Sequence, residues 1–352
     1  MARAPVIVPF GAEAADRLPA LLYEHFGYSY SADWMYSPAR IRQAMAGGTL
    51  DAVVAVDGDA LVGYLDLRFS FGSRQVVEIG IVLVDPALDE VPRARVAALL
   101  LKESVERIQG HVRDGLRLVT STETTDHTGT QRWLYRAGMV PTGLLFATVP
   151  AGQHLLRPDR YDPVQRHRGV PERRRQRRRR SEVLSVYPVR ELIAPYGVEL
   201  PERFAEILDA IYARLAMPVT FRAAGPASGP TELTVHHNVG RGTAILDVAR
   251  LGADAPARLV ERLEHYVLGH VPSVQLFVPL DQGRLEPTLA ALIAAGCRFG
   301  GLVPHFKGSD RLVLQRASDD DPLLTEAHLA DEVPRRILRL ARQSPVGVDQ
   351  RL

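Results

Sequence analysis

The stretch that decides the fold reads VVEIGIVLV over Val76–Val84, RARVAALLLKESVERIQG over Arg93–Gly110 and RLVTSTETT over Arg117–Thr125. The first segment is a nearly continuous run of branched apolar residues, which is typical of a strand covered on both faces. The second carries apolar residues at helical spacing, and a short helix ending in RAGM follows the third. Two strands joined by a crossover helix are expected to lie parallel, and small molecules usually bind at the mouth between their carboxyl ends.

The segments on either side complete an alternating α/β pattern. Upstream, the sequence predicts a strand over Val6–Phe10, helices over Ala14–Phe26 and Pro38–Ala46, and a hairpin that turns at Asp57–Asp59. Downstream, the strand VPTGLLFATVP ends by Pro150. The predicted order is therefore strand, two helices, three strands, helix, strand, helix, strand.

This order resembles the GNAT superfamily of acyl-CoA-dependent N-acyltransferases. Three short motifs are similar to those of a bacterial subgroup in which a second GNAT-like half follows the first. They are GYSY (Gly27–Tyr30), DHTGTQ followed by RAGMVPTGLL, and PERFAEILDAIYARL (Pro201–Leu215). The resemblance implies an α/β fold of tandem GNAT-like domains. Each is expected to be a mixed, mostly antiparallel twisted sheet with a parallel strand pair at the centre and flanking helices.

The second half repeats the pattern of the first. After the strand Ser181–Val189 and a helix, the order of strands and helices follows that of Val62–Pro150, with Gly138 and Gly296 in equivalent places. Such a repeat indicates internal duplication. We expect an acyltransferase-like domain over residues 1–150, an Arg/Pro-rich linker over 151–180, and a degenerate GNAT-like domain over 181–352 with a C-terminal helix at about Leu323–Gln343.

Composition limits the other classes of function. The 352 residues suit two domains, 46% are apolar, and the formal net charge of +2 gives no global signal for nucleic acid or membrane. Cys297 is the single cysteine, which excludes an internal disulfide and a cysteine-based zinc site, and His236 and His237 point to opposite faces of a strand, so no metal is expected. Without a membrane-spanning run or a signal-peptide pattern, the expected location is the cytoplasm.

The run RRRQRRRR over Arg173–Arg180 is the one strongly charged segment. It could bind phosphates of a nucleic acid, an anionic membrane surface or an acidic carrier protein. The alternative, which we prefer, is a solvated connector. No aromatic residues alternate with these arginines, so a stacking platform for single strands is missing and nucleic acid is disfavoured as a partner.

The resemblance implies acetyl-CoA or another acyl-CoA as cosubstrate, with its pyrophosphate held by backbone N–H groups at the start of the central helix. In the aligned segment Pro92–Ala97 only the last small residue fits the family pattern, and Arg95 replaces a glycine, where it either crowds the phosphates or adds charge to them. The expected anion donors are the N–H groups of Ala94–Ala97, although nearby acidic residues oppose an anion. The cofactor-binding candidates are Val82, Val84, Arg93, Arg95, Val96 and Ala97. The equivalent loop of the second half, Gly252–Leu259, lacks the glycine pair and is not expected to bind CoA.

Few residues could act as acid or base. Glu78, on the central strand, is the candidate general base, and the alternative is a polar network within the strand. His127 and Gln131 lie one helical turn apart, so they are candidates for a proton shuttle and a substrate anchor, or else for helix capping and packing. Leu134 stands where the family places a tyrosine acid, and we interpret the neighbouring Tyr135 as a packing residue.

An aromatic loop between the first two predicted helices is the candidate acceptor wall. Tyr28, Tyr30 and Trp34 belong to it and suit a flat or amphipathic acceptor, with a satellite core as the alternative. The leading hypothesis is an N-acyltransferase that moves an acetyl or short acyl group to the amine of a small molecule or peptide by direct attack, with N–H groups of Val76–Val84 facing the oxyanion. The alternatives are a catalytically silent protein that binds a metabolite or partner, and an enzyme repurposed for non-acetyl chemistry.

Overall fold

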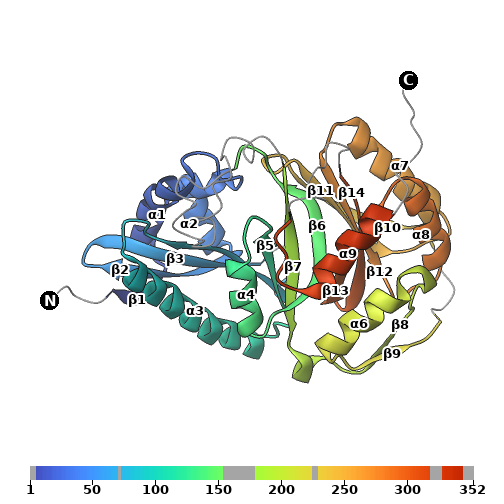
Figure 1. The fold of residues 1–352 in the computed structure, drawn as a ribbon, viewed down its shortest axis with the longest axis horizontal. Coiled ribbons are helices and arrows are strands. Elements are labelled where there is room, and N and C mark those ends of the chain that lie inside the picture. The colour runs from blue at the N-terminus through green and yellow to red at the C-terminus, as the bar shows by residue number, and fades with distance from the viewer. Residues whose placement is uncertain (1–4, 70–72, 154–178, 224–228, 318–326, 344–352) are drawn as a thin grey trace. The chain divides into compact units, whose positions relative to one another are not determined.

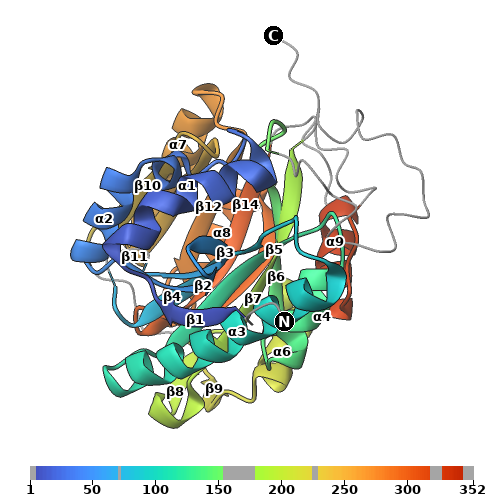
Figure 2. The ribbon, with the colours of Figure 1, turned by 90° about the vertical axis from the view of Figure 1, so that its left-hand side faces the viewer.

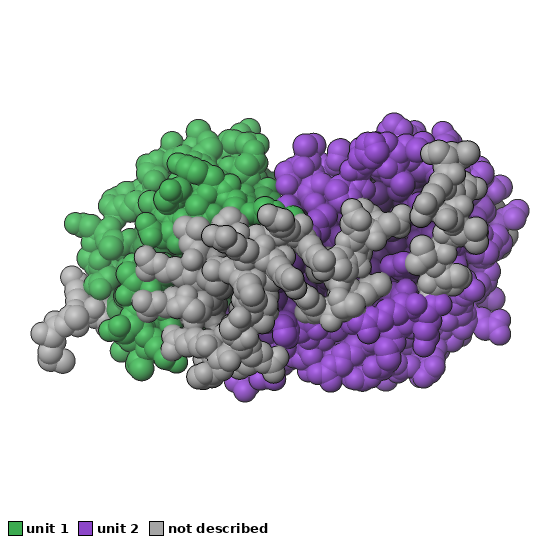
Figure 3. All heavy atoms as spheres, turned by 45° about the horizontal axis from the view of Figure 1, so that its top comes forward, with its two compact units in different colours: residues 1–121, 151–177 green, residues 122–150, 178–352 purple. Residues whose placement is uncertain are grey.

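The computed structural model describes residues 5–69, 73–153, 179–223, 229–317 and 327–343. The chain divides into two compact units (Figure 3): unit 1 comprises Met1–Ser121 and Ala151–Arg177, and unit 2 comprises Thr122–Pro150 and Arg178–Leu352. The division differs from the predicted boundary at residue 150. Residues 122–150 belong to unit 2, because the strand they contain pairs with strands that come after residue 178.

Unit 1 follows the predicted order of elements. Its helices and strands are β1 (Val6–Pro9), α1 (Ala12–Phe26), the short 3-10 helix η1 (Asp33–Tyr36), α2 (Pro38–Ala46), β2 (Leu50–Asp57), β3 (Ala60–Arg68), β4 (Val76–Val84), α3 (Glu90–Arg113) and the first residues of β5 (Leu118–Thr124). β4 has the predicted bounds. α3 is longer than predicted, because it begins directly after Asp89 and continues to Arg113.

The strands of unit 1 are ordered β1-β2-β3-β4-β5. β1 to β4 are antiparallel neighbours, whereas β4 and β5 run parallel, which confirms the predicted parallel pair. The parallel pairing joins Val76–Ile79 to Leu118–Ser121. Between the pairs Leu67↔Ile79 and Leu65↔Val82, two residues of β4 oppose one residue of β3, so β4 bulges where the parallel register ends.

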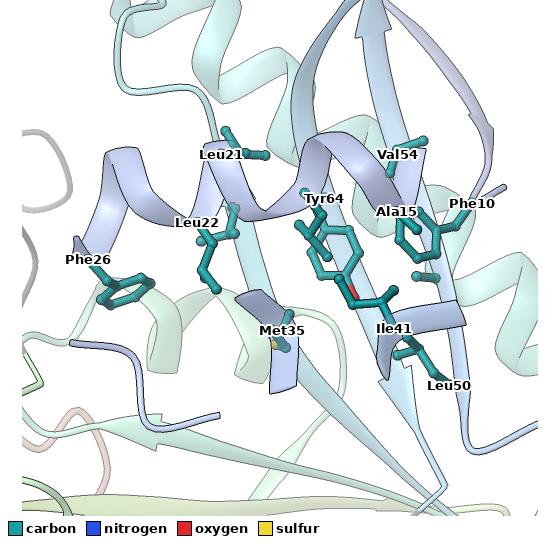
Figure 4. Packing of buried hydrophobic residues seen from close by; sticks show 13 residues of the cluster. Phe10, Ala15, Leu21, Leu22, Phe26, Met35, Ile41, Leu50, Val54 and Tyr64 are labelled. Carbon is teal, nitrogen blue, oxygen red and sulfur yellow. The ribbon is translucent and has the colours of Figure 1, made fainter. Parts of the chain in front are cut away.

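Helices cover both faces of these strands (Figure 2). α1, η1 and α2 bury a cluster of apolar residues against β2 and β3, and Figure 4 shows Met35 and Tyr64 within it. α3 lies on the opposite face, where Val96 and Leu100 press against Gly63. A Cβ at Gly63 would come within 2.7 Å of Val96 Cγ1, so a glycine is needed for this close approach.

Unit 2 contains the remaining elements (Figure 1). They are α4 (Gly129–Arg136), β6 (Val140–Val149), β7 (Arg180–Pro188), η4 (Arg190–Leu192), β8 (Tyr196–Val198), η5 (Glu202–Phe204), α6 (Ala205–Leu215), β9 (Val219–Phe221), β10 (Glu232–Asn238), β11 (Thr243–Arg250), α7 (Ala255–Leu268), β12 (Ser273–Pro279), α8 (Leu285–Ala294), β13 (Arg298–Phe306), β14 (Ser309–Ala317) and α9 (Glu332–Gln343). The strand order is β7-β6-β13-β14-β12-β11-β10, with β8 and β9 in a separate small sheet. β11 and β12 form a parallel pair.

Two predictions for the second half need correction. The strand predicted to open a second domain is β7, which pairs antiparallel with β6 from the first half of the chain. Of the arginine run, residues 173–178 lie outside the described residues, but the last two arginines are built into unit 2. Arg179 donates to the carbonyls of Ala147 and Arg241, and Arg180 forms an ion pair with Asp126. The solvated-connector prediction is therefore wrong for Arg179 and Arg180.

Candidate active site

The candidate site in unit 1 begins where β4 stops pairing with β5. In the described residues the parallel register ends at Ile79, while β4 continues to Val84 beside β3 alone. The carboxyl end of β4 therefore diverges from its parallel neighbour, and it lies at the mouth where the sequence analysis expects a small molecule to bind. Glu78, the candidate base, lies one residue before this divergence and is half-buried.

A buried ion pair fills the bulge of β4. Asp66 is fully buried, and its Oδ1 accepts the N–H of Ile81 at 2.8 Å. Its Oδ2 accepts from Arg68 Nη2 at 2.8 Å, from Arg68 Nε at 3.0 Å and from the Tyr64 hydroxyl at 3.1 Å. Three side-chain donors and one backbone donor thus surround the buried carboxyl group and replace the water that it loses on burial.

Gly80 makes this arrangement possible. A Cβ at Gly80 would lie 1.8 Å from Asp66 Oδ1 and 2.8 Å from Arg68 Nε. The same carboxylate affects the predicted oxyanion site, because the N–H of Ile81 already donates to Asp66. Of the N–H groups of Val76–Val84, the one at the bulge is therefore engaged within the protein.

Arg68 joins the ion pair to the aromatic loop and to Glu78. Its Nη2 lies 3.3 Å from the Tyr30 hydroxyl and 3.3 Å from Met35 Sδ, and its Cζ lies 5.8 Å from the centre of the Trp34 ring. Arg68 and Glu78 are direct cross-strand partners. Burial alone lowers the pKa of Arg68, but the neighbouring charges of Asp66 and Glu78, with Tyr30, hold this pKa well above its ordinary value. The guanidinium is therefore a permanent cation beside Glu78.

The aromatic loop is partly core and partly exposed. Tyr30 and Trp34 are half-buried and pack on the apolar cluster under α1, whereas Tyr28 is 81% exposed. Tyr36 donates to the carbonyl of Gly27 and accepts from the N–H of Tyr30, which fixes the loop. Tyr30 and Trp34 therefore belong to the apolar core, as in the satellite-core alternative. Both also contact Arg68 on the face that carries Glu78.

The start of α3 differs from the predicted phosphate site. Because the helix begins at Glu90, the N–H groups of Ala94–Ala97 lie beyond its first turn and are used by bonds within the helix. The helix geometry therefore gives no support to these N–H groups as anion donors. The unused N–H groups belong to Glu90 and Val91, since Pro92 has none. Arg93 Nη1 is buried, with no hydrogen-bond partner in the described part of the chain.

The other cofactor candidates are spread over two elements of unit 1. Arg95 is exposed on α3, while Val96 is buried against Gly63 and Ala97 is half-buried. On β4, Val84 is buried opposite Gly63, and Val82 is half-buried opposite Leu65. The packing of Val96 on the sheet speaks against a direct ligand contact there. Among these residues, Arg93 is the one whose buried polar atom fits an anionic ligand.

His127 and Gln131 belong to unit 2 and make local contacts there. His127 Nδ1 accepts the N–H of Gly129 at 3.2 Å, which supports the helix-capping alternative. Gln131 is fully buried; its Nε2 donates to the carbonyls of Thr124, His127 and His328, and its Oε1 accepts the N–H of Ala330. With both ends of its amide engaged, Gln131 anchors the segment before α9, and a substrate-anchoring role gains no support.

Two neighbours on α4 follow their sequence interpretation. Leu134, at the position where the family places an acid, is buried. Tyr135 is half-buried, and burial, with the charge of Glu123, raises the pKa of its hydroxyl. A hydroxyl with a raised pKa gives up its proton less readily, in agreement with a packing role for this residue.

In unit 2, a glutamine side chain occupies the place where the two parallel strands stop pairing. The register of β11 with β12 ends at Asp247↔Phe277, and beyond it the side chain of Gln282 binds the β11 end: its Oε1 accepts the N–H of Leu251 at 2.8 Å, and its Nε2 donates to the carbonyl of Ala249 at 3.0 Å. Gln282 thus uses the backbone groups that a ligand amide would need there, which is consistent with the expectation that the second half does not bind CoA.

Sequence reasoning missed Asp66 and Arg68. The strand ALVGYLDLR has the alternation of an ordinary half-exposed strand, so its charged residues look solvated. The available signal was Gly80, since an isolated glycine within a strand suggests a bulge or the close approach of another group.

Comparisons with known proteins give solved structures only, because no family model and no curated protein matches the chain. Among the similar structures, an aminoglycoside 6'-N-acetyltransferase from Enterococcus faecium is 13% identical, covers 54% of this chain and 99% of its own, and has a TM-score of 0.35. A GNAT family acetyltransferase from Elizabethkingia anophelis with acetyl-CoA bound is 12% identical, with coverages of 53% and 99% and a TM-score of 0.33. A PaiA N-acetyltransferase from Thermoplasma acidophilum in complex with coenzyme A is 13% identical, with coverages of 44% and 97% and a TM-score of 0.32.

Two features are absent from the described residues. None of the helices described is both long and apolar enough to cross a bilayer. The same residues contain no group of three or more His, Cys, Asp or Glu side chains arranged to hold a metal ion.

Proposed function

We propose that the chain is an acyl-CoA-dependent N-acyltransferase whose site lies at the divergence of β4 from β5. The observation that carries the proposal is the position of Glu78. It is a half-buried carboxylate one residue before the parallel register ends, on a strand followed directly by the crossover helix α3. A carboxylate at this place can hold a substrate ammonium and then accept a proton from it.

The reaction proposed is a direct transfer. The neutral amine attacks the thioester carbonyl carbon, the carbon–sulfur bond breaks and CoA leaves as a thiolate, while the proton lost by the amine passes to Glu78 directly or through water. The protein residues hold the amine against the thioester, and no enzyme residue is acylated. Arg93 is the proposed ligand of the CoA phosphates, because its buried Nη1 has no acceptor among the residues that the structure describes.

The tandem architecture is also a proposal. The two halves of the chain share one order of elements: strand, helix, strand, helix, strand, strand. In the first half these are β4, α3, β5, α4, β6 and β7, and in the second half they are β11, α7, β12, α8, β13 and β14. Each series has one parallel pair, β4 with β5 and β11 with β12. These similarities support a duplicated fold in which Gln282 closes the second site and the first half keeps the open one.

A second candidate function is acyl-CoA binding without transfer. The engaged N–H of Ile81 favours it, because that group does not stabilise an oxyanion while it donates to Asp66. Release of the CoA thiol in the presence of a panel of amines, followed with a thiol reagent, separates the two functions. The transferase predicts turnover that falls about a hundredfold or more in Glu78→Gln, the size of a general-base effect. It predicts no change in Glu106→Gln, whose side chain is exposed on α3. Binding of acetyl-CoA without turnover of any amine supports the second function.

A further inference from the structure

We propose that the acceptor is an amine that also carries a carboxylate a few bonds away, as in an α-amino acid with an aromatic side chain. This inference rests on the proposed transferase function and specifies its substrate class. It starts from the direct cross-strand pair Arg68 and Glu78, a permanent cation beside a carboxylate on the α1 face of the strands.

Arg68 has one guanidinium nitrogen to spare. Nε and Nη2 are directed to Asp66, and Nη2 also contacts Tyr30 and Met35, while Nη1 makes no hydrogen bond to the described residues. The side chain is 20% exposed, whereas Asp66 is fully buried. Asp66 therefore holds the guanidinium in place, and the remaining nitrogen is available to an anion from outside.

The spacing limits the ligand. Directly opposed residues on antiparallel strands have Cβ atoms about 4.5–5.5 Å apart, so groups bound by Arg68 and Glu78 must be close neighbours within one molecule. A ligand with a carboxylate and an ammonium a few bonds apart can place the first beside Arg68 Nη1 and the second beside Glu78. A ligand with amines alone offers no acceptor to Nη1, so an amine that also carries a carboxylate is preferred over polyamines and aminoglycosides.

The aromatic side chains beside the pair supply the remaining contact. The Trp34 ring lies next to the Arg68 guanidinium and the Tyr30 hydroxyl contacts Nη2, so both half-buried rings adjoin the proposed charge pair. An aromatic amino acid can place its ring against them with little cost in conformational entropy.

The test compares L-phenylalanine, phenylalaninamide and phenethylamine as acceptors for the intact wild-type protein with saturating acetyl-CoA. These share the ring and the amine and differ in the carboxylate. We expect kcat/KM to fall by about tenfold to a hundredfold when the carboxylate is replaced or removed, the range of a charge-assisted hydrogen bond. Arg68→Lys keeps a cation for Asp66 but lacks the spare planar nitrogen, so the preference should shrink to within about threefold. Arg74→Lys, on an exposed arginine of unit 1, is the matched control and should keep it.

Calorimetric titration of L-phenylalanine into the protein separates failure of the inference from failure of the function. Equal turnover of the three acceptors, or a preference unchanged in Arg68→Lys, overturns the amino-acid inference and leaves the transferase standing. If none of the three is acetylated while another amine of the panel is, the amino-acid inference is overturned and the transferase stands. If no amine of the panel is acetylated, the proposed function is contradicted; L-phenylalanine binding that needs Arg68 then still supports the charge pair as an amino-acid site, and no L-phenylalanine binding overturns both.

Discussion

Gly80→Ala tests whether Asp66 and Gly80 form one packed unit. The new Cβ would lie 1.8 Å from Asp66 Oδ1, and that oxygen cannot move away without breaking its 2.8 Å bond to the Ile81 N–H and straining the ion pair with Arg68. Overpacking a core costs about 1–3 kcal/mol, and a hydrogen bond to a charged group contributes about 1.5–3 kcal/mol. We therefore expect the free energy of unfolding of unit 1 to fall by roughly 3–5 kcal/mol.

A double-mutant cycle identifies the cause. Asp66→Ala alone should cost about 3 kcal/mol, at the lower end of the range for a broken buried ion pair because Arg68 keeps some access to water. Adding Gly80→Ala to Asp66→Ala should then cost less than about 1 kcal/mol, since the oxygen that clashes is gone, giving a coupling of at least about 2–4 kcal/mol.

Urea unfolding followed by tryptophan fluorescence measures these values, and Trp34 lies beside Arg68 as a local reporter. Gly110→Ala is the control: its Cβ would meet nothing closer than 3.9 Å within α3, and the exchange should raise stability by about 1 kcal/mol. If Gly80→Ala is as stable as the wild type, or if the costs of the two single substitutions add in the double mutant, Asp66 and Gly80 do not form one packed unit.

Three further predictions concern other parts of the chain. His25 is buried, and burial lowers its pKa from 6.5 to about 4 despite the charge of Asp85, so its stabilising neutral form is retained above pH 6.5. Stability should fall by up to about 3 kcal/mol as the pH drops from 6.5 to 4, and urea unfolding of His25→Leu should show a flatter pH profile if this group is responsible. A fragment of residues 1–150 should aggregate in size-exclusion chromatography, because β6 loses its partners β7 and β13; a monomer that melts cooperatively would contradict this. Gln131→Leu should speed limited proteolysis near Ala330 by removing the contacts to His328 and Ala330, and an unchanged cleavage rate would argue against the anchoring role.

Periodicity was enough to predict the elements of unit 1 but not all their ends. The branched run of β4 has no plausible alternative to a buried strand, and its bounds were predicted correctly. The start of α3 was misplaced by three residues, because the predicted helical segment began at Arg93 whereas the helix begins at Glu90. That small error moved the expected anion donors onto N–H groups that the helix itself uses.

Contacts between segments far apart in the chain could not be predicted from the periodicity of the sequence. The role of Gln131 depends on His328 and Ala330, almost two hundred residues later in the chain, and no local spacing reveals such partners. The pairing of β7 with β6 was hidden for the same reason, since the segment that separates them resembles a linker between domains. The ion pair of Asp66 with Arg68 is local, yet its burial depends on the bulge in β4 opposite.

Calorimetric titration of the full chain with acetyl-CoA tests whether unit 1 binds acyl-CoA. We expect saturable one-to-one binding that weakens by about tenfold to a hundredfold in Arg93→Gln, because Arg93 Nη1 is buried and has no acceptor among the described residues. We expect no change in the matched variant Arg95→Gln, two residues further along α3 and exposed. Absence of any binding heat at concentrations up to about a millimolar, or equal losses in the two variants, would contradict these expectations.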